Sequence, residues 1–312
     1  MTADQDVHVE QQRSGGLLMA EMTRKLAGKV AVITGASQGL GEHLAFELAA
    51  NGAAVALAAR NRERLEAIQG TIETRGGRAV AVPTDLSSES DCKALIERVN
   101  EAMGPIDILV LNAGSGTFGK LEELPGLDAI HDSMDVNFFG AAYPAYYALR
   151  DLIARKGLIA YVTSGSGHLP MAGYLGYSTS KHAMNGFFEC LRLEMYSHGV
   201  DVLTINPGDM YNDDGAGRTF FTPEGQELKI DLSVRRRNDI KRHPASSVAK
   251  KSCEAIIDRR RELDLSPRIQ KLATRARPFI PGPIDRLIYK RVSTLRSAFR
   301  SEVEEHQRSN AA

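Results

Sequence analysis

Residues 30–41 read VAVITGASQGLG, an apolar run that passes directly into a glycine-rich turn. A short apolar run bounded by turn residues is typical of a strand buried on both faces, so we expect a strand at Val30–Thr34. The turn has the spacing G-x-x-x-G-x-G, and Glu42–Ala50 then shows the pattern of an amphipathic helix. Glycines let a backbone approach a pyrophosphate, and a helix N-terminus offers N–H donors. A lone glycine turn is often only a turn, but between a strand and a helix it favours nucleotide binding.

Predicted strands and helices alternate along the chain as far as residue 265. Further buried strands are expected at Ala54–Ala59, Arg78–Pro83, Ile106–Leu111, Leu158–Thr163 and Val200–Ile205. Helical patterns lie between them, at Arg62–Thr74, Glu89–Met103, Leu127–Arg155 and Tyr174–His198. Such alternation favours an α/β fold of the Rossmann type, a doubly wound parallel sheet with helices on both faces. In that fold ligands bind beyond the carboxyl ends of the strands.

The ends of the chain and one internal segment depart from this alternation. Residues 1–27 show no sustained periodicity, and we expect a flexible N-terminal arm. Residues 28–265 are expected to form one domain that ends with a helix from Ser246 and an edge strand at Arg261–Leu265. Within it, residues 209–244 are polar and weakly periodic, which predicts a long loop that either serves as a substrate lid or is disordered. Residues 266–312 are expected to form a basic, amphipathic, helical C-terminal extension.

Composition excludes several classes of function. The net charge is +0, which argues against a general nucleic-acid binder. The three cysteines (Cys92, Cys190 and Cys253) are scattered, without a C-x-x-C pair or clustered histidines, so neither a metal site nor a disulfide framework is expected. No apolar run reaches the roughly 18 residues of a membrane span, and the N-terminus does not resemble a signal peptide. Reduced thiols and these absences predict a cytoplasmic protein.

A second motif pairs a phenol with an ammonium group. Tyr177 and Lys181 are four residues apart in a predicted helix and therefore lie on one face of it. Ser164 follows the predicted strand at Leu158–Thr163, so a strand end and a neighbouring helix can bring the three groups together. A cation beside a phenol favours its deprotonated form, which suits an acid/base catalyst. By itself a Tyr-x-x-x-Lys pair is often only a surface pair, and other motifs must support it.

Taken together, these motifs resemble those of the short-chain dehydrogenase/reductase family. The matching elements are the T-G-x-x-x-G-x-G turn from Thr34, Asn112-Ala113-Gly114, Asn137, Ser164 and Tyr177-x-x-x-Lys181, in the family's order and spacing from about Lys29 to Gly208. Members of the family have a doubly wound parallel sheet, and most transfer hydride between a nicotinamide cofactor and a carbonyl/alcohol pair. The resemblance therefore implies an oxidoreductase that interconverts a ketone or aldehyde and an alcohol.

The resemblance also implies a role for each catalytic position. Ser164 would orient the substrate oxygen, and Tyr177 would be the acid/base. Lys181 would bind the nicotinamide ribose and favour the ionised form of the phenol. Asn137 matches the residue that kinks the long central helix and seats a water molecule of the proton relay.

Cofactor contacts are implied in the same way. They comprise Gly35, Ser37, Gln38, Gly39, Leu40 and Gly41 in the first turn, Arg60, Asp85 and Leu86, Asn112, Ala113 and Gly114, Pro207 and Gly208, together with Tyr177 and Lys181. Two positions depart from the family pattern. Leu111 replaces the first Asn of its commoner N-N-A-G turn, and Asn212 stands where a Thr usually lies near the carboxamide.

The end of the second predicted strand favours NADP(H) over NAD(H). An acidic residue there would bind the ribose hydroxyls of NAD, whereas an arginine accommodates the 2′-phosphate. This chain has Ala59 followed by Arg60, so an acceptor is missing and a guanidinium is supplied. Ser37 can add a hydroxyl. The alternative is that Arg60 and Arg62 only begin a solvated helix, which would leave an NAD-preferring enzyme.

Basic residues accumulate near the C-terminus, where residues 235–300 contain 19 Lys/Arg against 6 Asp/Glu. An apolar stripe with basic flanks can lie on an anionic membrane surface, although packing on the domain or on a sister subunit is the simpler reading. Extensions of this kind are similar to those of family members that act on lipids, such as hydroxysteroid dehydrogenases and ketosphinganine reductases. A hydrophobic ketone or alcohol is therefore the expected small-molecule substrate.

Two other functions remain open at this point. The first is a non-catalytic, cofactor-binding regulatory protein on the same fold, against which the intact Ser, Tyr and Lys set argues. The second is an enzyme that uses the cofactor for epimerisation or dehydration. The long predicted helices at Leu127–Arg155 and Tyr174–His198 are expected to pair in a homodimer or homotetramer, as in the family.

Overall fold

The computed structural model of the chain describes residues 24–213, 218–221, 227–230, 242–290 and 292. Most of the predicted N-terminal arm, the larger part of the predicted lid and the end of the C-terminal extension lie outside these residues. Leu26, inside the predicted arm, is buried and packs with the core.

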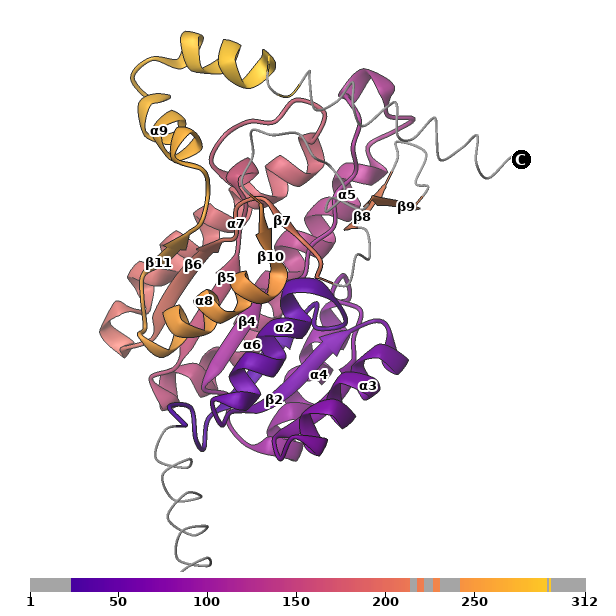
Figure 1. The fold of residues 1–312 in the computed structure, drawn as a ribbon, viewed down its shortest axis with the longest axis vertical. Coiled ribbons are helices and arrows are strands. Elements are labelled where there is room, and N and C mark those ends of the chain that lie inside the picture. Colours follow the sequence, from indigo (N-terminus) through magenta and orange to yellow (C-terminus); the bar gives the residue numbers. More distant parts are fainter. Residues whose placement is uncertain (1–23, 214–217, 222–226, 231–241, 291, 293–312) are drawn as a thin grey trace, which may run out of the picture.

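One parallel sheet of seven strands forms the centre of the molecule (Figure 1). Its order is β3-β2-β1-β4-β5-β6-β11, and every pairing is parallel. The strands are β1 (Val30–Thr34), β2 (Ala54–Ala59), β3 (Arg78–Pro83), β4 (Ile108–Leu111), β5 (Leu158–Val162), β6 (Asp201–Asn206) and β11 (Glu262–Asp264). From β1 the chain adds β2 and β3 on one side, and then returns to add β4, β5 and β6 on the other side. The carboxyl ends of β1 and β4 are therefore the switch point of the sheet. The predicted fold class is confirmed.

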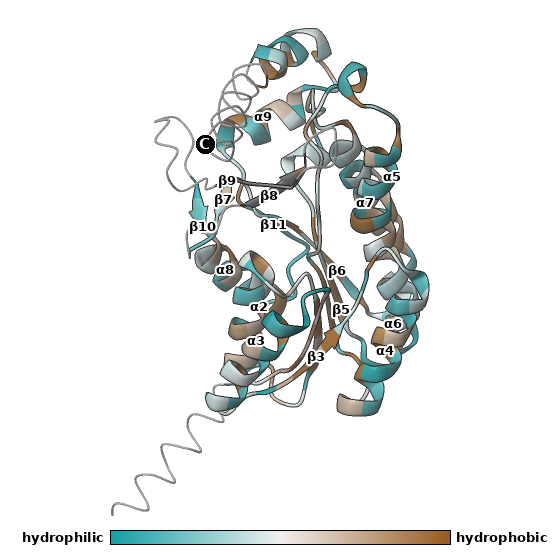
Figure 2. Ribbon diagram, turned by 90° about the vertical axis from the view of Figure 1, so that its right-hand side faces the viewer, coloured by the Kyte–Doolittle hydropathy of each residue, from teal (hydrophilic) through white to brown (hydrophobic). Residues whose placement is uncertain are grey.

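Helices cover both faces of the sheet, as Figure 2 shows edge-on. One layer contains α2 (Gly39–Ala50), α3 (Arg62–Thr74) and α8 (Ala245–Ile257), and the other contains α4 (Glu89–Met103), α6 (Gly140–Arg155) and α7 (Leu175–Glu194). Two separate clusters of buried apolar residues fill the space between the sheet and these layers. The β strands are apolar on both faces because each face meets one of these clusters.

The long helix expected at Leu127–Arg155 is interrupted. It consists of α5 (Asp128–Met134), a π-helix at Asp135–Phe139 and then α6. Asn137 lies in the π-helix and is completely buried. A π turn admits one extra residue, and such turns occur mostly at functional sites. Short 3₁₀ turns at Leu121–Glu123, Gly165–Gly167 and Tyr196–His198 complete the helical segments of this part of the chain.

Past β6, short strands precede α8. β7 (Met210–Tyr211) pairs with β10 (His243–Pro244), and β8 (Arg218–Phe221) forms an antiparallel pair with β9 (Glu227–Ile230). Beyond β11 the chain continues into α9 (Arg268–Ala276), and residues 281–290 are helical as well. These last segments lie above the carboxyl edge of the sheet in Figure 1.

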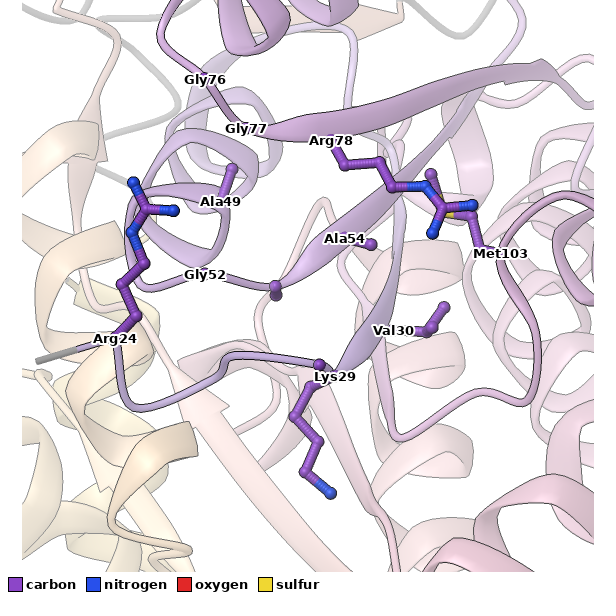
Figure 3. A pocket seen from close by; sticks show the side chains of 12 residues that line it. Arg24, Lys29, Val30, Ala49, Gly52, Ala54, Gly76, Gly77, Arg78 and Met103 are labelled. Atoms are coloured by element: carbon purple, nitrogen blue, oxygen red, sulfur yellow. The ribbon is translucent and has the colours of Figure 1, made fainter. Parts of the chain in front are cut away.

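A hollow of about 350 Å³ lies at the opposite, amino edge of the sheet (Figure 3). Its lining includes Arg24, Lys29 and Arg78, but these side chains point away from one another. Lys29 is paired with Asp107, and Arg78 donates to the backbone oxygen of Ala102. This hollow therefore has no convergent charge that would hold a ligand.

Asp107, immediately before β4, is the buried carboxylate that joins β1, β4 and α6. It is 3% exposed and accepts hydrogen bonds from Lys29 Nζ (2.9 Å), Arg155 Nε (3.0 Å) and the backbone N–H of Val30 (3.0 Å). Burial acts to raise the pKa of this carboxyl, but the hydrogen bonds from Val30, Lys29 and Arg155 outweigh burial and lower it. The ionised carboxylate thus contributes to folding.

We expect Asp107→Asn to lower the free energy of unfolding by about 2 kcal/mol at neutral pH, because two cations lose their charged partner. The figure is modest since both cations are 42% exposed and screened by water. The folded-state pKa lies below the ordinary 3.8, so the contribution is complete above that value and is lost as pH falls through the folded-state pKa. Urea unfolding at several pH values measures it.

The matched control is Asp258→Asn, which removes an exposed ion pair with Arg260 and should cost less than about 1 kcal/mol. Equal costs for the two variants, or a difference that persists unchanged in strong acid, would contradict this account of Asp107.

Candidate active site

The predicted glycine turn is held against the end of β4. A Cβ atom on Gly41 would lie 2.2 Å from the backbone oxygen of Gly35, so only glycine fits there. Gly35 itself has φ +65°, and a Cβ atom on it would lie 2.8 Å from Ala113 Cα. Asn112 Nδ2 donates to the backbone oxygens of Thr34 (3.1 Å) and Gly35 (3.2 Å). Two turns that are far apart in sequence thereby form one surface.

The N-terminus of α2 is open at this surface. Its N-cap residue, Gln38, is exposed and makes no capping hydrogen bond with its side chain. The first N–H groups of a helix need acceptors, which a side chain, water or a bound anion supplies. The arrangement suits a phosphate group beside Gly39 and Gly41.

Asn212 lies over the same turn. Its Oδ1 is 2.8 Å from the position that a Cβ atom of Gly39 (φ +56°) would occupy. The next residue, Asp213, bonds His43 Nε2 (3.1 Å) and Ser246 Oγ (2.7 Å). These contacts tie the segment after β7 to α2 and α8. The resemblance implies a residue near a nicotinamide carboxamide at position 212, and the Asn212 amide lies beside Gly39 of the glycine turn.

Arg60 and Asp85 follow the ends of β2 and β3. Asn61 caps α3 by accepting from the backbone N–H of Arg64 (3.0 Å), so Arg60 precedes the helix and is exposed in the turn. Hydrogen bonds from Ser87 lower the pKa of Asp85, and the charge of Arg60 contributes a smaller share. Arg60 therefore lies close enough to Asp85 to interact with it electrostatically. No hydrogen bond or ion pair engages the Arg60 guanidinium in the described part of the chain.

Asn137 organises the loop after β4. Its Oδ1 accepts from the backbone N–H of Ser115 (2.7 Å), and its Nδ2 donates to the backbone oxygen of Ser115 (2.8 Å) and to Ser180 Oγ (2.9 Å). These bonds use both amide hydrogens of the side chain. The π-helix is what brings this buried amide to the loop. A water held by Asn137 would therefore be bound through its backbone or through Oδ1, which can accept a second hydrogen bond.

Lys181 is a buried cation at the end of β5. It is 3% exposed, and its Nζ donates to the backbone oxygen of Val162 (2.8 Å). The Nζ lies 5.8 Å from the centre of the Tyr177 ring. A Cβ atom on Gly114 would lie 3.5 Å from this Nζ and 3.3 Å from Asn137 Oδ1, so the three residues meet at one point.

Tyr177 and Ser164 occupy the same edge of the sheet. The Tyr177 ring packs on Gly116, where a Cβ atom would lie 3.1 Å from Cδ2 of the ring. Ser164 begins the 3₁₀ turn after β5, and its Oγ accepts from the backbone N–H of Ser166 (3.2 Å). No hydrogen bond joins the Tyr177 and Ser164 side chains among the residues described.

The remaining predicted positions also lie at this edge. Leu86 is buried against Gly140, and Pro207 with Gly208 follows β6. Gly208 (φ +66°) approaches the chain after β11, since a Cβ atom there would lie 2.7 Å from the backbone oxygen of Leu265. The predicted positions thus lie in the turns after β1 to β6, in the first turn of α2, in the π-helix and in α7.

Sequence reasoning missed three contributors to this edge. Ser180 bonds Asn137 and also donates to the backbone oxygen of Tyr177 (2.8 Å). Its place inside the Tyr177–Lys181 motif was an available signal. Ser115 and Gln270 carried no comparable signal, because their contacts depend on segments distant in sequence.

Within the described residues, no group of three or more His, Cys, Asp and Glu side chains could hold a metal ion. The same residues form no helix that is both long enough and apolar enough to cross a membrane.

Two solved structures share the fold. An alcohol dehydrogenase from Thermococcus sibiricus, complexed with 5-hydroxy-NADP, superposes with a TM-score of 0.64 at 28% identity and covers 76% of this chain and 95% of its own. A metagenomic short-chain oxidoreductase in complex with NADP gives a TM-score of 0.64 at 28% identity, with 78% and 99% covered.

Plant sequences are more similar. The 11-beta-hydroxysteroid dehydrogenase-like 3 of Arabidopsis thaliana is 39% identical over 189 residues, which are 60% of this chain and 61% of that protein. The 11-beta-hydroxysteroid dehydrogenase of Pinus massoniana is 38% identical over 204 residues, 65% of this chain and 57% of that protein. The chain thus spans about three fifths of these relatives. Residues 29–216 match the model of the short chain dehydrogenase family, and the chain belongs to that family.

Proposed function

We propose that this protein is an NADP(H)-dependent oxidoreductase that interconverts a ketone or aldehyde and an alcohol, with Tyr177 as the acid/base. The observation that carries the proposal is the buried Lys181 ammonium, which lies 5.8 Å from the Tyr177 ring centre at the edge where the glycine turn ends. A buried cation beside a phenol is an arrangement for proton transfer.

The residues present fit a dinucleotide. The close approach of Gly41 to Gly35 exposes backbone groups of the turn, beside which the Asn212 amide lies, and α2, whose N-cap side chain makes no capping bond, offers N–H donors for a diphosphate. Asp85, after β3, and Asn112–Gly114, after β4, would hold the adenosine part, while Lys181 would bind the nicotinamide ribose. When bound, the cofactor supplies or accepts hydride at the carbonyl carbon.

The chain's own groups then manage the proton. Ser164 and Tyr177 would hold the carbonyl oxygen of the substrate, and the Tyr177 hydroxyl would donate its proton as negative charge develops there. The Lys181 ammonium would stabilise the resulting phenolate. The backbone of the π turn at Asn137 would seat the water that returns the proton. In the oxidising direction the same groups act in reverse order.

NADP(H) is preferred in this proposal because the Arg60 guanidinium makes no hydrogen bond or ion pair within the described residues. It stands outside α3, and its guanidinium can pair with a 2′-phosphate in the bidentate geometry that arginine provides. The nearby Asp85 carboxylate is exposed to water, which weakens its attraction for Arg60, so it would not prevent this contact. The two solved relatives described as NADP complexes support the same reading.

The proposed substrate is hydrophobic. The plant relatives are named for hydroxysteroids, and the chain covers only part of their length, so the substrate class is inferred for this chain rather than carried across. The C-terminal segments lie beside the carboxyl edge of the sheet, next to the proposed site. A non-catalytic cofactor-binding protein is the alternative.

The C-terminal segments also expose an apolar surface with basic neighbours. We use the term C-terminal surface for its large exposed side chains, which are Ile269 (51%), Leu272 (63%), Phe279 (84%), Ile280 (50%), Leu287 (48%) and Tyr289 (65%). Arg268, Arg275 and Arg286 are exposed among them. Apolar residues flanked by cations suit the interface of an anionic membrane, and we propose peripheral membrane contact there.

Copies of the chain are proposed to pair through the outer faces of α6 and α7. Tyr146 on α6 is 71% exposed, and Leu193 on α7 is 76% exposed. Large exposed apolar side chains on neighbouring helices are typical of a surface that another protein covers. A homodimer or homotetramer would bury them.

Tyr177→Phe should lower kcat with a ketone by at least about a hundredfold, because the proton donor is removed while the ring remains. NADPH binding, measured by cofactor fluorescence, should be retained. Oxidation of NADPH across a panel of ketones measures turnover. The control is Tyr196→Phe, which loses a hydroxyl on a residue that is 87% exposed and outside the site. A rate for the Tyr177 variant within tenfold of the parent would exclude the proposed acid/base.

Arg60→Asp should reverse or reduce the preference for NADPH over NADH, with the ratio of kcat/KM values falling by about 10- to 100-fold. The physical reason is the loss of a charge-assisted pair with the 2′-phosphate. Arg62→Asp is the matched control, since Arg62 lies within α3 and pairs with Glu66 on the surface. An unchanged ratio in the Arg60 variant, or equal effects of both variants, would favour the alternative of a merely solvated helix start.

Membrane contact is tested by co-sedimentation with phosphatidylcholine vesicles that contain or lack phosphatidylserine. We expect binding only to the anionic vesicles, weakened by salt and lost in a Leu272→Asp/Phe279→Asp double variant. Leu121→Asp, a change at another exposed leucine (57%), is the control. Protein that stays wholly in the supernatant contradicts the proposal. Sedimentation velocity without lipid then reports whether a second copy covers the surface instead.

A further inference from the structure

Helix α9 has an inner and an outer face. Ile269 and Leu272 point outward and are more than half exposed, whereas Ala273 is 6% exposed and belongs to the buried side. Lys271 fixes the helix to the end of β11, because its Nζ donates to the backbone oxygen of Asp264 (2.6 Å) and lies 3.6 Å from Asp264 Oδ2. The C-terminal extension thus begins with an anchored helix.

Gln270, on the inner side of α9, reaches the turn that carries Ser164. A Cβ atom built on Gly165 would lie 1.5 Å from Gln270 Nε2 and 2.8 Å from its Cδ. All three heavy atoms closest to that position belong to the Gln270 amide. The amide therefore occupies the space over Gly165 that a side chain would fill, directly beside the residue proposed to hold the substrate oxygen.

The Gln270 amide retains its capacity to form hydrogen bonds. In the described part of the chain its Nε2 and Oε1 make no hydrogen bond, and the residue is partly buried. Ser266, in the same segment, is 8% exposed, and its hydroxyl also has no partner among the described residues. Ser266 borders Gly208, whose Cβ position lies 3.3 Å from the Ser266 N atom. Two polar side chains with bonding capacity left over therefore flank the turns after β5 and β6.

We propose that Gln270 is a specificity-determining residue of the substrate site, where its amide binds a second oxygen function of the substrate, separate from the reacting carbonyl. This inference rests on the proposed function and deepens it. A neutral amide both donates and accepts, so it suits a hydroxyl or carbonyl group. A carboxylate would instead be matched by a cation. The substrate class is thus an apolar ketone or alcohol that carries a further neutral oxygen substituent.

The first test compares two ketones that differ only in a hydroxyl remote from the reacting carbon. Gln270→Ala should raise KM for the hydroxylated ketone by about three- to tenfold, the equivalent of one lost neutral hydrogen bond. KM for the ketone without the hydroxyl, and NADPH binding, should stay within twofold of the parent. Leu272→Ala, on the outer face of the same helix, is the matched control and should change neither KM.

The second test uses Gly165→Ala, which must push the Gln270 amide aside. Alone, it should raise KM for the hydroxylated ketone as Gln270→Ala does. In the Gln270→Ala background it should have little additional effect, because the atoms that its methyl group meets are gone. Additive effects of the two changes would contradict contact between the amide and this turn.

The outcomes separate this inference from the proposed function. Suppose that the parent reduces ketones, that Tyr177→Phe does not, and that Gln270→Ala has the same KM as the parent for both ketones. The proposed role of Gln270 is then wrong, and the enzyme assignment stands. If no ketone is reduced at all, the proposed function fails first. Thermal unfolding of each variant shows that a changed KM does not reflect a damaged fold.

Discussion

The Lys181 ammonium, buried at the end of β5, is the interaction on which the site depends. A cation that is 3% exposed is costly unless polar atoms replace its water, and the backbone oxygen of Val162 does so at 2.8 Å. This bond fixes α7 against β5, and Ser164 lies two residues beyond Val162. The position of the phenol at Tyr177, one helical turn before the lysine, follows from the same bond. The positions of Lys181, Ser164 and Tyr177 therefore all depend on one requirement, which is that the protein must provide polar atoms for a buried charge.

The same physical logic holds the cofactor side of the site. Side-chain amides bond the backbone of loops from other elements: Asn112 bonds the turn after β1, and Asn137 bonds Ser115 on both its N–H and its C=O. Loops held at both polar atoms lose little further freedom when a ligand binds, which is the condition for a preorganised site. The glycines at 35 and 41 are needed because these loops approach within contact distance of one another.

Much of this arrangement could be predicted because its signals are local. The run at Val30–Thr34, the glycine spacing after it and the four-residue separation of Tyr177 and Lys181 each follow from one short stretch. The resemblance implied a kink at Asn137, but the π-helix does not follow from the local pattern, because the bonds of the Asn137 side chain reach Ser115 and Ser180, 22 and 43 residues away. The position of Asn212 over Gly39 could not be predicted for the same reason, because these two residues are far apart in sequence. Helix periodicity continues across residues 135–139 and gives no sign of the break.

The C-terminal extension shows how one helix can serve two surroundings. Polar Gln270 and Lys271 face the sheet edge, while Ile269 and Leu272 face outward, which is the reverse of the usual pattern for a helix packed on a globular core. On the inner side, Ala273 is buried and Lys271 is bonded to Asp264, whereas the Gln270 amide makes no hydrogen bond among the described residues and is suitable as part of the wall of a binding site. An outer face that is apolar needs a covering of its own. Both features are explained if the outer face of α9 meets the apolar environment proposed above and Gln270 on its inner side borders the Ser164 turn.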